Sequence, residues 1–119
     1  GAVGAMGYLD GSLLAVPEAN KDAYRDLTTR QAAILMEYGA TRVVDGWGDD
    51  VPDGKVTDFK GAVKATSEET VVFSWIEWPS KAVRDQAWGK VFADPRMHSD
   101  TPYDAQRWVH GGFAPILDA

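Results

Sequence analysis

Proton transfer is the chemistry that the polar residues of this sequence suggest most directly. His110 carries an imidazole, a group that ordinarily titrates near neutral pH and so suits a general acid or base. Asp10 and Asp45 stand in stretches that are otherwise apolar, where a carboxylate is either paired or shifted in pKa. An aspartate next to the imidazole would orient it as a general base. His110, Asp45 and Asp10 are therefore the candidate catalytic residues, with a structural role as the alternative for each.

Aromatic side chains form a second group with a chemical use, because their flat faces stack on flat apolar ligands. The chain has five Trp among 119 residues, and two or three of them are expected to serve only the core or a subunit interface. Trp47, Trp88 and Trp108 are the candidates for the walls of an aromatic pocket, with core packing as the alternative. Ser74, a polar residue within an apolar run, is a candidate substrate contact.

Several other chemistries are excluded or disfavoured. The chain has no Cys, which removes disulfides, thiolate nucleophiles, iron–sulfur clusters and thiolate zinc sites. Four aspartates between residues 49 and 58 fit no EF-hand spacing, so a solvated acidic loop is the simpler interpretation. His98 and His110 belong to no zinc-binding motif. We therefore expect neither a metal nor another cofactor.

The charge balance bears on partners. Lys and Arg number 12 against 18 Asp and Glu, a net charge of −6 that repels nucleic acid and anionic membrane surfaces. No apolar run is long enough to span a bilayer, and no secretory signal opens the chain, so a cytoplasmic location is expected. Residues 1–5 resemble a cloning remnant ahead of a natural start at Met6. Residues 6–119 are expected to form one domain.

The elements that position these residues follow from periodicity and from turn formers. Strands are expected over 8–16, 41–47, 70–78 and 107–113. Asn20 is expected to cap a helix with Tyr24 among its inward positions and Gly39 as its stop, and Ser80 to cap a second helix that ends after Asp94. The order strand, helix, strand, strand, helix, strand predicts an α+β fold, the ferredoxin-like βαββαβ plait. Its four-stranded antiparallel sheet carries both helices on one face. The connection of about 20 residues after residue 47 is expected to be functional or to cover a sheet edge.

Both faces of this sheet are apolar. In the third strand, residues of one parity are Val71, Phe73 and Trp75, and those of the other are Val72, Ile76 and Trp78. Two helices on one side cover only one of these faces, and burying a side chain of this size stabilises by roughly 1.5–3 kcal/mol. A second copy of the sheet would cover the other face. The sequence therefore predicts a homodimer with two sheets packed face to face.

Several motifs, in order along the chain, resemble the YbaA-like family, domain of unknown function 1428. They are Tyr8-Leu9-Asp10-Gly11, Gly48-Asp49-Asp50-Val51-Pro52, Glu69 to Ile76, Asp94-Pro95-Arg96, Pro102-Tyr103-Asp104 and Gly111-Gly112-Phe113. The resemblance covers residues 6–119 and implies the dimeric α/β-barrel superfamily. That superfamily includes cofactor-free monooxygenases, polyketide cyclases, muconolactone isomerases and haem degraders. Most of these use a pocket between sheet and helices.

Departures from the family pattern bear on ligand binding. The family usually has a large apolar residue at Ser12, a small aliphatic one at Trp47, Asn at Trp88, Met at Trp108 and Tyr or similar at His110. Such changes imply a remodelled cavity, and they make Ser12 a further candidate substrate contact. The resulting expectation is a dimer that binds an aromatic or other apolar small molecule. It would act as a cofactor-independent isomerase, cyclase or monooxygenase; a non-catalytic ligand-binding or structural dimer is the alternative.

Overall fold

A computed structural model describes residues 7–119, so Met6 and the expected cloning remnant at 1–5 lie outside the described residues. Residues 7–119 form four strands and three helices, joined in part by short 3-10 turns. In order they are β1 (Tyr8–Pro17), α1 (Lys21–Glu37), β2 (Arg42–Trp47), α2 (Phe59–Ala62), β3 (Glu69–Trp78), α3 (Lys81–Ala93) and β4 (Val109–Phe113). The expected order of strands and helices is confirmed, with the single turn of α2 as an addition.

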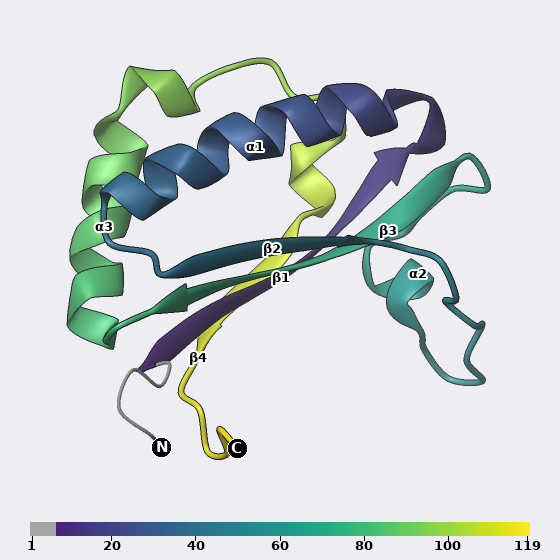
Figure 1. Cartoon of the computed structure of the whole chain (residues 1–119). Coiled ribbons are helices and arrows are strands. Elements are labelled where there is room, and N and C mark those ends of the chain that lie inside the picture. The colour runs from purple at the N-terminus through teal and green to yellow at the C-terminus, as the bar shows by residue number, and fades with distance from the viewer. Residues whose placement is uncertain (1–6) are drawn as a thin grey trace.

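The strands form one antiparallel sheet in the order β2-β3-β1-β4. The helices α1 and α3 pack on one face of this sheet, whereas α2 lies beyond the other face (Figure 1). This arrangement confirms the ferredoxin-like plait. No helix among residues 7–119 has both the length and the apolar character needed to cross a bilayer.

The helix ends follow local chemistry with one exception. Ser80 Oγ accepts a hydrogen bond from the backbone N–H of Val83 at 3.1 Å, as expected of a capping residue at the start of α3. Gly39 has φ +118, the left-handed conformation that glycine tolerates after a helix. Asn20 occupies the position before α1 as expected, but its side chain forms no capping hydrogen bond and instead donates to the carbonyl of Pro102 at 3.0 Å. That bond ties the start of α1 to the segment before β4.

The two faces of the sheet are divided as the alternation predicts. Val72 and Trp78 are buried beneath the helices, Val72 with Leu14 and Trp78 against Ala87 of α3. We call this side of the sheet the helix face and the opposite side the outer face. Phe73 and Trp75 lie on the outer face, where Phe73 keeps 47% of its surface exposed.

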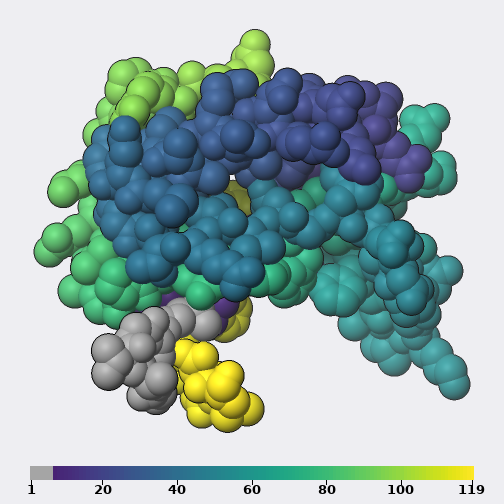
Figure 2. Space-filling view, viewed as in Figure 1, coloured from purple at the N-terminus to yellow at the C-terminus, as the bar shows by residue number. Residues whose placement is uncertain are grey.

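The long connection between β2 and β3 covers one end of the outer face. Val63, just after α2, is 1% exposed and packs against Ala15 and Val71. Since Ala15 and Val71 belong to the two central strands, this contact covers part of one face and not the sheet edge that was one of the two expectations. The part of the connection nearer β2 projects from the body of the molecule, at the right of the space-filling view (Figure 2).

The last strand is shorter than expected. It begins at Val109, because Arg107 lies in a 3-10 turn instead of the strand. The Arg107 guanidinium donates to both carboxylate oxygens of Glu69, each at 2.7 Å, and its Nε donates to Asp104 at 3.0 Å. These bonds tie the turn that precedes β4 to the first residue of β3.

Candidate functional site

Four polar side chains lie side by side across all four strands. Asp45 of β2 is opposite Ser74 of β3, Ser74 is opposite Ser12 of β1, and Ser12 is opposite His110 of β4. Residues directly opposite one another point to the same face of a sheet. We call this set the polar row. It lies on the helix face, because its members share the parity of buried Leu14.

One half of the polar row is engaged by hydroxyl groups. Thr28 of α1 and Ser74 each donate a short hydrogen bond to Asp45, one to each carboxylate oxygen. Tyr24, one turn earlier in α1, is 8% exposed, and burial raises its pKa well above the usual value, with the charge of Asp45 adding to the effect. Burial followed by Asp45 also raises the pKa of Tyr103. Carboxylate, hydroxyls and phenols therefore form one cluster beneath α1.

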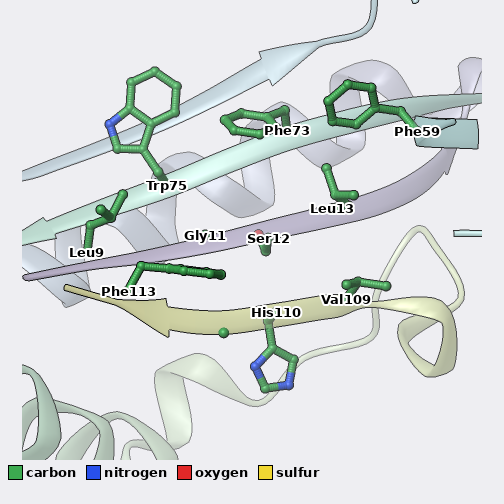
Figure 3. A pocket seen from close by; sticks show the side chains of 11 residues that line it. Leu9, Gly11, Ser12, Leu13, Phe59, Phe73, Trp75, Val109, His110 and Phe113 are labelled. Carbon is green, nitrogen blue, oxygen red and sulfur yellow. The ribbon is translucent and has the colours of Figure 1, made fainter. Parts of the chain in front are cut away.

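The other half of the row is free to meet a ligand. Neither the Ser12 hydroxyl nor the His110 imidazole has a hydrogen-bond partner within residues 7–119. The His110 ring stacks on Trp108, with centroids 3.8 Å apart and planes 22° from parallel. Trp108 remains 41% exposed. Figure 3 shows the His110 side chain pointing away from the apolar residues of the outer face.

Neither candidate aspartate contacts His110. Asp45 and His110 lie on the two edge strands, so three strand spacings of about 4.8 Å separate them by about 14 Å. The Asp10 carboxylate accepts N–H groups from Arg84 at 2.7 Å, Trp78 at 2.8 Å and Trp88 at 3.0 Å. No Asp–His pair forms within residues 7–119, and the imidazole is held by stacking alone.

Three candidates belong to the hydrophobic core as much as to any site. Asp10 is 9% exposed, and both oxygens of its carboxylate accept hydrogen bonds from the donors just described. This favours a structural role for Asp10 over a catalytic one. Trp88 packs on the buried Trp78 ring at 6.4 Å. Trp47 packs on Tyr24 at 6.5 Å, in the core cluster beneath the start of α1. The structure thus separates Ser12, Trp108 and His110 from the rest, although their roles remain predictions.

Two of the aspartates in the connection between β2 and β3 have local hydrogen-bond or ion-pair partners. Asp58 accepts the backbone N–H groups of Gly61 at 2.6 Å and Gly54 at 3.1 Å, and so caps α2. Lys60 pairs with Asp53 at 3.1 Å. Within residues 7–119 no three His, Asp or Glu side chains are grouped as a metal site would require.

Two residues of the site escaped the sequence analysis as chemical candidates. Thr28 and Tyr24 reach the polar row from α1, and a helix places residues four apart on one side. That spacing was a usable signal for Thr28, because Tyr24 already occupied an inward position. The space-filling view shows a small opening between α1 and β2 (Figure 2).

The outer face carries a separate, apolar cavity of about 420 Å³ (Figure 3). Its walls include Phe73, Trp75 and Phe113, and its floor includes Gly11 and Gly111. A Cβ at either glycine would lie 3.5 Å from the Phe113 ring, so the ring rests directly on bare backbone. Ser12 and His110 also border this cavity, but their side chains have the parity of the opposite face of the β layer.

Comparisons with known proteins agree with this fold. A family model described as a protein of unknown function (DUF1428) matches residues 7–105. "Uncharacterized protein YbaA" of Escherichia coli K12 is 53% identical over 116 residues, covering 95% of this chain and 99% of the relative, and its namesake from Shigella flexneri gives the same values.

A solved structure shares the architecture. A mutant of SnoaB, described as a cofactor-independent oxygenase from Streptomyces nogalater, matches with a TM-score of 0.53 over 94% of this chain and 96% of that chain. Its sequence identity is 11%, so this likeness concerns the fold alone. The resemblance inferred from sequence motifs is confirmed: this chain belongs to the DUF1428 family of YbaA-like proteins.

Proposed function

We propose that this protein binds a planar aromatic small molecule on the helix face of its sheet, at the β1–β4 end of the polar row. The observation that carries the proposal concerns two neighbouring polar side chains, Ser12 and His110. Neither has a hydrogen-bond partner within residues 7–119. The half-exposed Trp108 beside them offers a flat surface for a ring. A binding site for a flat ligand needs this combination of a stacking surface and a few unoccupied polar groups.

The chemistry proposed for this site is proton transfer without a cofactor. The His110 imidazole would take a proton from an acidic hydroxyl or ring carbon of the ligand. The Ser12 hydroxyl would donate a hydrogen bond to the oxyanion that forms. Isomerisation, cyclisation and oxidation of an electron-rich ring by dioxygen each begin with such a deprotonation. SnoaB, which shares the fold, is described as a cofactor-independent oxygenase, which supports this class of reaction.

The proposal includes a homodimer formed through the outer face, in the cytoplasm. Phe73, Val109 and Phe113 are each exposed by 44–55% on this face. Large apolar side chains gathered on one open sheet mark an interaction surface, and a second copy presents a matching sheet. Two copies related by a two-fold axis would cover both sheets at once.

Binding and turnover can be tested with a panel of phenols, naphthols and quinones. Saturable quenching of tryptophan fluorescence identifies binders, and chromatography with oxygen-consumption measurements then detects turnover. Ser12→Leu should weaken binding, because the larger side chain fills the space beside His110. His110→Ala should abolish turnover, whereas His98→Ala should leave it unchanged because His98 is exposed and bonds to the carbonyl of Phe92. Turnover that survives His110→Ala would overturn the catalytic proposal.

A non-catalytic ligand-binding protein is the second candidate. It is favoured by one observation, that the His110 imidazole lacks the orienting carboxylate usual for a general base. Saturable quenching without turnover of any binder would support this candidate. Absence of quenching by every compound of the panel would overturn both candidates.

A further inference from the structure

We infer that the ligand of the helix face carries a positive charge, an ammonium or amidinium group that lies against Asp45. This inference rests on the proposed function, because it concerns the other end of the same polar row. It assigns the ligand a polarity: a cationic end under α1 and a ring beside Trp108 and His110.

Asp45 differs from the buried carboxylates of this protein in having no cationic partner. Asp10 pairs with Arg84 at 2.7 Å, and Glu69 with Arg107 at 2.7 Å. Asp94 likewise pairs with Arg96 at 2.8 Å. Asp45 is half-buried and, within residues 7–119, forms no ion pair; its only bonds come from two neutral hydroxyls.

Hydroxyl groups satisfy the geometry of a carboxylate without neutralising its charge. A half-buried charge without a counterion is costly, and proteins normally supply one. The two oxygens of a carboxylate offer about four lone-pair sites. Thr28 and Ser74 each use one of them, so further acceptor sites remain for the N–H groups of a ligand.

The rings around Asp45 suit a cation as well. Tyr24 lies 6.5 Å from Trp47 and 5.8 Å from Tyr103, measured between ring centroids, in tilted and edge-on arrangements. Trp47 already interacts with one cation, since Lys21 Nζ lies 5.3 Å from its ring centroid. Aromatic faces next to a carboxylate are the usual surroundings of a bound ammonium group.

The phenol groups of Tyr24 and Tyr103 lie close enough to Asp45 for its negative charge to affect them. The charge of Asp45, after burial, raises the pKa of both Tyr24 and Tyr103, so these groups stay neutral. An anionic ligand group would meet the same repulsion. The expected ligand is therefore an arylalkylamine, with its ammonium group separated from the ring by about two strand spacings, roughly 10 Å.

The test compares three ligands that carry one ring on a six-carbon linker long enough to span this distance: 6-(2-naphthyl)hexylamine, 6-(2-naphthyl)hexanol and 6-(2-naphthyl)hexanoate. Titration calorimetry at neutral pH should give a Kd for the amine about tenfold below that for the alcohol, and weaker binding for the carboxylate. Asp45→Asn should raise the amine Kd about tenfold, to that of the alcohol. Asp49→Asn, which removes the same charge from an exposed loop residue, should leave it unchanged.

A second measurement does not depend on the variant folding. Added salt should weaken binding of the amine to the natural protein and leave the alcohol unaffected. Equal affinity for all three compounds, or an amine Kd unchanged by salt and by Asp45→Asn, would overturn the inference while leaving the proposed function in place. If none of the three compounds binds, both fail.

Discussion

Replacing Asp10 by Asn tests whether this aspartate is structural or catalytic. The carboxylate accepts four N–H groups, two from Arg84 and one each from the indoles of Trp78 and Trp88. The amide oxygen of Asn has two lone pairs, so at least two of these donors lose their acceptor. Each buried donor left unsatisfied costs about 1–3 kcal/mol. Because the Arg84 side chain is 22% exposed and water can reach it, we expect a total loss of about 2–4 kcal/mol.

Urea unfolding followed by tryptophan fluorescence at pH 7 measures this loss directly, and ligand affinity and turnover are measured on the same sample. The matched control is Asp22→Asn, whose side chain is 94% exposed, and it should change the free energy of unfolding by less than about 0.5 kcal/mol. We expect Asp10→Asn to be destabilised while it retains turnover at low temperature. A variant as stable as the natural protein but without turnover would refute the structural assignment and return Asp10 to the catalytic residues.

Two further predictions concern stability at low pH and assembly. The Arg107 guanidinium lowers the pKa of Glu69 to about 2, so this ion pair should stabilise the fold above about pH 5 and its contribution should vanish as the pH falls toward 2. Urea unfolding at pH 7 and pH 3 should show about 1–2 kcal/mol of this effect, and Arg107→Gln should remove it; an unchanged difference between the two pH values would contradict the assignment. Phe73→Asp on the outer face should convert the proposed dimer into a monomer in sedimentation at micromolar concentration, whereas a natural protein that already sediments as a monomer would exclude that dimer.

Local signals in the sequence predicted most of the fold. The alternation of Val71, Phe73 and Trp75 with the residues between them predicted both faces of β3, because strand side chains alternate regardless of the rest of the chain. Ser80 was a correct cap since its bond closes within three residues. Asn20 takes the expected position before α1 but makes no capping bond, because its side chain bonds to Pro102, 82 residues away.

The arrangement of the site depends on contacts that no local pattern encodes. Asp45, Ser74, Ser12 and His110 form a row only because three strand registers bring them opposite one another. Register depends on turn geometry and on packing of the whole sheet. The bond between Asp10 and Arg84 likewise joins residues 74 positions apart. The sequence therefore identified these residues as candidates for proton transfer or binding, but it could not predict which of them lie in contact.

A single β layer separates the side chains of the polar row from the outer cavity. The number of residues in β1 therefore matters more for placing these side chains than the choice of apolar residue at each position. Ser12 and Leu13 are neighbours in β1, yet the Ser12 side chain has the parity of the helix face and the Leu13 side chain has that of the outer face. Deleting one residue early in β1 would shift the register on one side of the deletion, and every side chain there would point to the other face of the sheet. A mutational library should therefore tolerate many apolar exchanges at Leu13 and almost no single-residue insertions or deletions from Leu9 to Val16.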